Sequence, residues 1–344
     1  MRTVAWKDGK VILINQTRLP HEFSLIETNE IERIATAIRR LEVRGAPAIG
    51  VTAAYGMALV ALQSQADSPE AAQIEFDQAY RLLAATRPTA TNLFWALDHM
   101  RDFAKPFLKS KDWKRLGVRL LEEAERMADE DVSINQRLAE LGATLIPDEA
   151  VILTHCNCGP LCAVDLGTAM APVIYAHNKG KKLHVFTDET RPLLQGARLN
   201  AWELANAGVP YTLITDNTAA WILATRKVDL IMIGVDRVAA NGDTAAKIGV
   251  YGLAVLAKYH QVPFYAVSPL STIDFNLPNG KAIPVEERDP DEVRKVFGTP
   301  ITMTDANVIN YAFDVTPNEL ITAIVTEAGI AYPPYNSSLA RLVS

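Results

Sequence analysis

The spacing of apolar residues predicts a helical first part and a second part in which strands alternate with helices. Helical spacing recurs at about 47–64, 70–86, 91–104 and 113–144. Beyond residue 146, short and nearly continuous apolar runs take over, which is typical of strands covered on both faces. These runs lie at 150–154, 183–187, 211–215, 230–234, 263–267 and 321–326.

Strands that alternate with helices favour a parallel sheet with right-handed crossovers. We therefore predict an α/β protein with a mostly helical N-terminal domain over 1–130 and a doubly wound parallel-sheet domain over 131–344. A small β-hairpin is predicted to open the chain at 3–6 and 11–14, because β-rich runs flank the turn signal Asp8-Gly9. Asn29 and Glu32 have the spacing of a capping box, which predicts that a helix begins there.

The composition of the chain argues against nucleic acids and membranes as binding partners. Of the 344 residues, 34 are Lys or Arg and 40 are Asp or Glu, so the formal net charge is −6 and no dominant basic face for nucleic acid is expected. The most membrane-like segment, 46–63, is rich in Ala and favours a buried core helix, and the first residues lack the apolar stretch of a signal peptide. Three cysteines crowded into 156–162 fit a reducing cytoplasm better than a disulfide framework. We expect a cytoplasmic protein with no nucleic-acid or membrane partner.

Polar segments follow three of the predicted strands, where open α/β sheets bind their ligands. They span 155–160, 188–196 and 235–247, and we expect them to converge on one crevice. Cys156 suits either a buried, apolar packing role or, beside a helix N-terminus, a thiolate that acts as a base. A metal site made by Cys156, Cys158, Cys162 and His155 is a weaker alternative, because the spacing is not a paired Cys-x-x-Cys arrangement. Asp236 either caps a helix or pairs with Arg237, or it is a partly buried acid that keeps its proton.

Phosphate binding, if present, does not use a glycine-rich nucleotide loop. The sequence has neither a Gly-x-Gly-x-x-Gly run after a strand nor a Gly-x-x-x-x-Gly-Lys-Ser/Thr run. Arg44, Arg87 and Lys247 stand beside predicted turns or helix starts. Singly they suit surface charges, and together they suit a phosphate site. Gln195 is either a solvated helix residue or a hydrogen-bonding partner for sugar hydroxyls.

Six motifs carry a resemblance to a known family. They are RGAPAIG at 44–50, RPTATN at 87–92, THCN at 154–157, DETRPLLQGARL at 188–199, GVDR at 234–237 and NGDT at 241–244. In this order they resemble the methylthioribose-1-phosphate isomerases, and the similarity continues through IPVEER at 283–288 to ITAI at 321–324. The wider superfamily, that of the translation initiation factor 2B alpha, beta and delta subunits, also contains ribose-1,5-bisphosphate isomerases and non-catalytic regulatory subunits. THCN together with Gly-x-Asp-Arg favours the catalytic branch.

The resemblance implies an intramolecular oxidoreductase of methionine salvage, an aldose–ketose isomerase that converts 5-methylthioribose 1-phosphate to 5-methylthioribulose 1-phosphate. It implies a Rossmann-like catalytic domain, a cytoplasmic homodimer, and neither metal nor cofactor. By the family's pattern the catalytic pair is Cys156 and Asp236. The family's substrate-binding positions correspond to Arg44, Gly45, Ala46, Arg87, Gln195, Ala246 and Lys247.

Two departures keep related functions open. The family usually has Asn where this chain has Ala246, and a small Ala or Thr where it has Cys158. An isomerase of 5-deoxyribose 1-phosphate or ribose 1,5-bisphosphate is therefore one alternative, and a sugar-phosphate-sensing regulatory subunit is another. The residues also leave two routes open: Cys156 removes the C2 proton to give an enolate, or hydride moves directly from C2 to C1.

Overall fold

The chain forms two compact units. The computed structural model describes residues 2–88, 90–109 and 113–343. The N-terminal unit comprises Met1–Ile134 and Pro160–Gly167, and the C-terminal unit comprises Asn135–Gly159 and Thr168–Ser344. The sequence placed a boundary at 130/131 and did not assign 160–167 to the first unit, because that assignment depends on contacts distant in sequence.

The N-terminal unit opens with a three-stranded antiparallel sheet in the order β1-β2-β3. Its strands are β1 (Val4–Lys7), β2 (Lys10–Ile14) and β3 (Leu25–Thr28). The predicted hairpin is confirmed: Lys7 pairs with Lys10, and Asp8 and Gly9 have φ of 50° and 78°, as a tight hairpin turn requires. Strand β3 was not predicted, because four residues with two apolar side chains give too short an alternation to distinguish it from a loop.

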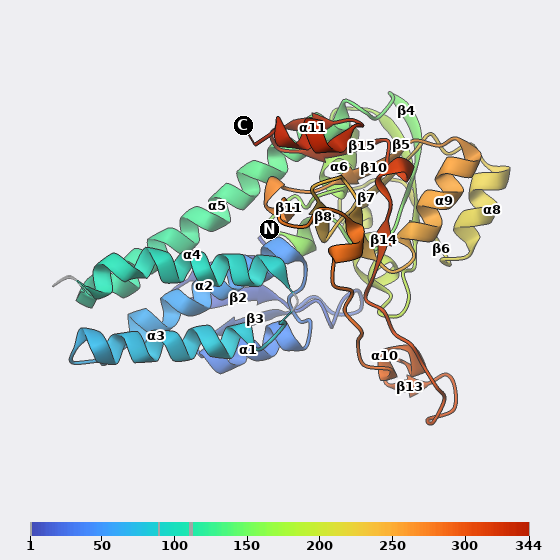
Figure 1. Ribbon diagram of the computed structural model, residues 1–344. Helices are drawn as coiled ribbons and strands as arrows, with labels where there is room; N and C mark the ends of the chain where they lie inside the picture. Colours follow the sequence, from blue (N-terminus) through green and yellow to red (C-terminus); the bar gives the residue numbers. More distant parts are fainter. Residues whose placement is uncertain (1, 89, 110–112, 344) are drawn as a thin grey trace. The chain divides into compact units, whose positions relative to one another are not determined.

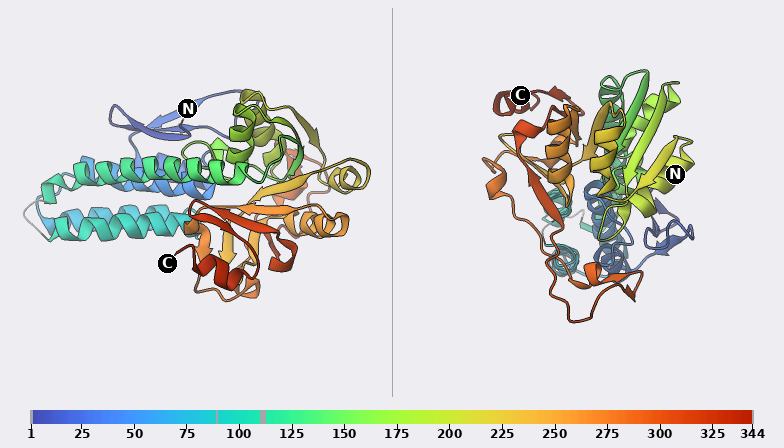
Figure 2. Two further views of the ribbon diagram at one scale, coloured as in Figure 1. Left: turned by 90° about the horizontal axis from the view of Figure 1, so that it is seen from above. Right: turned by 90° about the vertical axis from the view of Figure 1, so that its right-hand side faces the viewer.

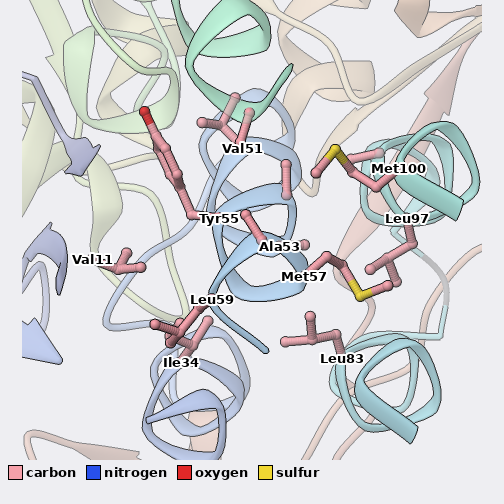
Figure 3. Close-up of a cluster of buried hydrophobic side chains, with 14 of the residues drawn as sticks. Val11, Ile34, Val51, Ala53, Tyr55, Met57, Leu59, Leu83, Leu97 and Met100 are labelled. Carbon is pink, nitrogen blue, oxygen red and sulfur yellow. The ribbon is translucent and has the colours of Figure 1, made fainter. Parts of the chain in front are cut away.

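Five helices follow, and one of them lies at the centre of the core. They are α1 (Ile31–Arg39), α2 (Ala46–Gln63), α3 (Pro69–Ala84), α4 (Thr91–Leu108) and α5 (Leu116–Ala143), whose residues from Asn135 onward belong to the C-terminal unit. Side chains pack around α2 on several sides: Leu59 lies toward Ile34, and Met57 lies toward Leu97 (Figure 3). In the described part of the chain, α2 alone is long and apolar enough to cross a membrane, and 67% of that window is buried, as in a core helix.

The predicted capping box at the start of α1 is wrong. The N-cap residue is Glu30, and its side chain makes no capping hydrogen bond. Thr28, the last residue of β3, satisfies part of this turn instead, because its Oγ1 accepts a hydrogen bond from the Glu30 N–H at 3.0 Å. The unpredicted strand therefore moves the helix start one residue beyond Asn29.

The C-terminal unit contains a seven-stranded sheet in the order β16-β15-β10-β7-β4-β5-β6, parallel except for β16. Its strands are β4 (Glu149–Thr154), β5 (Lys182–Asp188), β6 (Tyr211–Ile214), β7 (Leu230–Gly234), β10 (Phe264–Val267), β15 (Ala323–Thr326) and β16 (Gly329–Ala331). All six apolar runs predicted as strands lie in this sheet. Its helices are α6 (Met170–Asn178), α7 (Ala201–Asn206), α8 (Thr218–Thr225), α9 (Val250–His260) and α11 (Tyr335–Ala340), of which α8 and α9 lie side by side (Figure 1).

A second, four-stranded sheet in the order β11-β8-β9-β14 was not predicted. It contains β8 (Arg237–Ala239), β9 (Thr244–Lys247), β11 (Ile273–Asp274) and β14 (Phe313–Thr316). The turn between β8 and β9 is fixed by Asp243, whose carboxylate accepts hydrogen bonds from the backbone N–H groups of Gly280 and Asn318 at 2.8 and 2.9 Å. A separate segment with α10 (Asp291–Arg294), β12 (Lys295–Val296) and β13 (Thr299–Pro300) extends away from the large sheet (Figures 1 and 2).

Candidate active site

The predicted convergence of three strand ends is confirmed by the topology. Strands β7, β4 and β5 are neighbours and parallel, so their carboxyl ends lie at one edge of the sheet. Thr154, the last residue of β4, donates its hydroxyl to the carbonyl of Met232 on β7 at 2.8 Å. The loops that carry Cys156, Gln195 and Asp236 therefore leave the sheet from adjacent positions.

Cys156 is held in a specific conformation just beyond β4. Its φ is 70°, in the left-handed region that few side-chain-bearing residues adopt, and only 8% of the residue is exposed. Its backbone N–H donates to Oγ1 of Thr190 at 2.8 Å, and its Sγ donates to Oε1 of Gln195 at 3.6 Å. The structure thus brings together two of the predicted site residues, one from each of two neighbouring loops.

The loop after β5 that supports Cys156 is itself fixed by Asp216. The two carboxylate oxygens of Asp216 accept the backbone N–H groups of Thr190 and Arg191 at 2.7 and 2.8 Å. Gly196 is needed in this loop, since a Cβ there would lie 1.7 Å from the carbonyl oxygen of Asp188. Sequence reasoning did not single out Thr190 or Asp216, because their roles depend on hydrogen bonds between separate loops.

The other two cysteines have packing roles. Sγ of Cys158 accepts the backbone N–H of Gly234 at 3.2 Å, which joins the loop after β4 to the end of β7. Cys162 belongs to the N-terminal unit and is buried there. Among the described residues, no cysteine is part of a cluster of His, Cys, Asp or Glu with ligand atoms close enough to share a metal ion. The cysteine metal site considered from the sequence therefore has no support.

Asp236 lies where the chain turns from β7 into β8. Its backbone N–H donates to the carbonyl of Ala245 at 2.9 Å, which fixes the backbone at this turn. Its side chain is exposed, so the expectation of a partly buried carboxyl is wrong. Asp236 stands two residues beyond Gly234, the last residue of β7, and directly before Arg237, the first residue of β8, so it lies in the connection between two strands.

Ala246 and Lys247 occupy strand β9, opposite Asp314 and Phe313 of β14. Because side chains alternate along a strand, the two residues face opposite sides. Ala246 is fully buried in an apolar cluster, so a contact from this position to a substrate would come from its backbone. The half-buried Lys247 holds its Nζ 5.0 Å from the centre of the Phe313 ring, which orients the ammonium group.

The four remaining predicted residues, Arg44, Gly45, Ala46 and Arg87, belong to the N-terminal unit. Arg44 and Arg87 are half-buried. Gly45 precedes the first turn of α2 with φ of 94°, and a Cβ there would lie 2.2 Å from the carbonyl oxygen of Cys162. Glycine at this position therefore has a structural reason. Thr89, within the 87–92 motif, lies outside the described residues.

Sequence reasoning missed one buried pair beside Cys156. Nδ1 of His155 lies 2.8 Å from Oδ2 of Asp188, and both side chains are 3% exposed. Burial raises the pKa of Asp188 to about 6, against the opposing effect of His155. Burial alone would lower the pKa of His155, but the hydrogen bond and charge of Asp188 outweigh it and raise that pKa. The two residues are separated by 32 others, so no local spacing marks them as partners.

With Asp216, this pair forms the one group in the described chain with metal-ligand atoms all within 4.8 Å. Hydrogen bonds account for the arrangement. His155 contacts Asp188 through Nδ1 and the Ile248 carbonyl through Nε2, and both Asp216 oxygens accept backbone N–H groups. The group is better explained as a hydrogen-bond network than as a metal centre.

Similarity to known proteins agrees with this geometry. Residues 42–333 match the Initiation factor 2 subunit family. Methylthioribose-1-phosphate isomerase of Chloroflexus aurantiacus is 50% identical over 100% of this chain and 99% of that protein. The crystal structure of 5-methylthioribose 1-phosphate isomerase from Pyrococcus horikoshii OT3 has a TM-score of 0.93 and 45% identity, covering 99% of this chain and 95% of that one. A structure titled translation initiation factor eIF-2B subunit delta, from A. fulgidus, has a TM-score of 0.89 and 39% identity, covering 100% of this chain and 99% of that one. The chain belongs to the Initiation factor 2 subunit family and, within it, to the methylthioribose-1-phosphate isomerases.

Proposed function

We propose that the chain converts 5-methylthioribose 1-phosphate to 5-methylthioribulose 1-phosphate in methionine salvage, with Cys156 and Asp236 as the catalytic pair. The observation that carries the proposal is the buried Cys156 thiol directed at the Gln195 amide, at the edge of the sheet where α/β proteins bind ligands. Full-length identity of 50% to an isomerase of that name supports the same substrate.

The reaction requires a ring opening and a hydrogen transfer. The sugar is locked as a cyclic 1-phosphate, so a proton must reach the ring oxygen before an open chain forms. In the proposal Asp236 supplies that proton from its neutral acid form, once bound substrate excludes water from the carboxyl. In one route Cys156 acts as a thiolate that removes the C2 proton to give an enolate, which takes up a proton at C1. In the other route Cys156 polarises C2 while hydride moves directly from C2 to C1.

Gln195 and the cations have binding roles in this proposal. Gln195 is 6% exposed, and its amide orients the thiol and hydrogen-bonds a sugar hydroxyl. Arg44, Arg87 and Lys247 bind the phosphate, the arginines through their fork of N–H groups and Lys247 as a point charge. Gly45 and Ala46 contribute backbone N–H groups at the start of α2, and Ala246 contributes its backbone on β9.

Arg87→Ala is expected to raise KM about tenfold to a hundredfold with a much smaller change in kcat. A hydrogen bond to a charged group contributes about 1.5–3 kcal/mol, and this contact holds the phosphate equally in the ground state and the transition state. Steady-state kinetics measure the effect. Arg81→Ala is the matched control, because Arg81 is an exposed cation on α3 and its loss leaves KM unchanged. A KM within twofold of wild type for Arg87→Ala would remove Arg87 from the phosphate site.

A product assay with purified protein tests the proposed function directly. We expect turnover of 5-methylthioribose 1-phosphate to the ketose, with kcat/KM at least tenfold above that for 5-deoxyribose 1-phosphate and ribose 1,5-bisphosphate. The second candidate, a sensing subunit, is favoured by the 39% identity to the protein titled eIF-2B subunit delta. Binding of a sugar phosphate without any turnover would support the sensor and contradict the isomerase.

Four further expectations remain proposals. The homodimer derives from the resemblance alone, whereas the cytoplasmic location derives also from the three cysteines and from the lack of a signal-peptide stretch. A reaction without metal or cofactor derives from the resemblance alone as well. The division into domains at 130/131 is proposed as the approximate limit of the helical part, near the unit boundary at 134/135.

A further inference from the structure

His155 contacts two segments that carry proposed site residues. Its backbone directly precedes Cys156, and its Nδ1 meets Asp188 at the end of β5. Its Nε2 lies 3.0 Å from the carbonyl oxygen of Ile248, the residue after Lys247. One buried ring therefore connects the backbone of the thiol loop to the backbone that presents the lysine.

The segment that meets Nε2 is fixed from its other side. Gly249 caps α9 with φ of 106°, and a Cβ there would lie 3.0 Å from Cε1 of His155, so the ring packs against bare backbone. Asp314 accepts the N–H groups of Gly249 and Tyr251 at 2.7 and 3.0 Å. A displacement of the ring would consequently move a rigid turn rather than a loose loop.

Each of the two hydrogen bonds of the His155 ring needs one hydrogen atom, carried either by the ring nitrogen or by the atom that it contacts. A carbonyl oxygen only accepts, so Nε2 carries a hydrogen. The 2.8 Å contact between Nδ1 and Asp188 needs a second hydrogen, on either atom. We propose that His155 is a positioning residue that holds the Cys156 and Lys247 segments in register, and that it does so only while the pair with Asp188 retains this second proton.

The charges around the pair favour retention of the second proton. The carboxylates that face it are Asp188 on β5, Glu189 and Asp216 on the loops beyond β5 and β6, and Asp314 on β14. Their negative charges favour the protonated ring. Burial alone would lower the pKa of His155, but the surrounding carboxylates, chiefly Asp188, raise it. Losing the proton would set a lone pair of the ring against a carboxylate.

Two substitutions distinguish the effect of losing a hydrogen bond of His155 from the effect of losing the Asp188 charge. His155→Gln has all its donors on one atom and cannot donate at both ends of the former ring, so we expect kcat for 5-methylthioribose 1-phosphate to fall at least tenfold and KM to rise. Asp188→Asn can donate its amide to Nδ1 while His155 donates to Ile248, so its loss of kcat is smaller. Both variants keeping wild-type kcat and KM, or Asp188→Asn losing as much as His155→Gln, would overturn the proposal. The matched control is His99→Gln, which removes the His99–Glu123 pair of the N-terminal unit and leaves kcat and KM unchanged.

A second measurement needs no substrate, so it separates this inference from the proposed function on which the kinetic test rests. Folding raises the pKa of both Asp188 and His155, so the folded chain binds more protons than the unfolded chain. The Asp188 contribution to stability is lost as pH rises from about 3.8 to about 6, and the His155 contribution is lost above pH 6.5, as pH rises through the raised folded pKa of the ring. Relative to Asp188→Asn, the wild-type folding constant should fall with pH by up to about tenfold per unit above pH 6.5, where only the folded chain keeps the His155 proton. Parallel profiles from urea denaturation would contradict the shared proton, even if His155→Gln fails to fold.

Discussion

Cys156→Ser is expected to lower kcat for 5-methylthioribose 1-phosphate by about 10²–10⁴-fold, the range that a positioned acid or base contributes. The hydroxyl can keep the hydrogen bond to Gln195 that the thiol makes at 3.6 Å, so the backbone and the loops should stay in place. A hydroxyl, however, is a far weaker acid than a thiol and is a poor proton acceptor at C2. Single-turnover kinetics with saturating substrate measure the chemical step alone.

Two companion variants make this result specific. Cys158→Ser keeps an acceptor for the Gly234 N–H and should retain kcat within a few-fold, which controls for the loss of any thiol. Asp236→Asn should lower kcat severely while sugar-phosphate binding persists, since it removes the proposed proton donor. A near-normal rate for Cys156→Ser would favour hydride transfer with the cysteine outside the chemistry. A near-normal rate for Asp236→Asn would remove the acid from its role.

Gly45→Ala is expected to cost at least about 3 kcal/mol of the free energy of unfolding. Two effects add up: an alanine at φ of 94° stores about 1–3 kcal/mol of backbone strain, and its Cβ would lie 2.2 Å from the Cys162 carbonyl oxygen. Because the close atoms are backbone, no side-chain rotation relieves the contact. Urea denaturation followed by circular dichroism measures the loss.

Gly180→Ala provides an unusually close control for this effect. Gly180 has φ of 93°, nearly that of Gly45, but a Cβ there meets no atom within 4 Å. It should therefore show the backbone strain alone, so the difference between the two variants isolates the contact with Cys162. Equal losses for the two would mean that the 160–167 segment yields at little cost, contrary to its packing against the start of α2.

Much of the fold could be predicted because the strands of the large sheet are nearly continuous apolar runs. Val151–Thr154 and Leu230–Gly234, for example, are covered on both faces and have no polar interruption. The four-stranded sheet escaped prediction because β8 and β9 are stabilised by pairing and by Asp243, whose hydrogen-bond partners lie at Gly280 and Asn318. Short strands of this kind have no hydrophobic period of their own.

The sequence could predict those parts of the site that follow from the convergence of strand ends. Topology brought Cys156 and Gln195 together, as the position of each after a strand indicated. The exposure of Asp236 was not predictable, because exposure at a strand end depends on which other segments pack over it. The pair of His155 and Asp188 also escaped, since a hydrogen bond between two strand ends leaves no trace in spacing.

The division of the chain into units limits which fragments of it can be expressed separately. Residues 160–167 belong to the N-terminal unit although they follow β4 of the other unit. There the carbonyl of Leu161 accepts the side-chain amide of Gln16, and the N–H of Val164 donates to Asp131. A gene fragment that ends at 134 would lack both contacts, whereas one that begins at 135 would carry Leu161 and Val164 without their partners. Neither unit can therefore be expressed intact by a single cut of the gene.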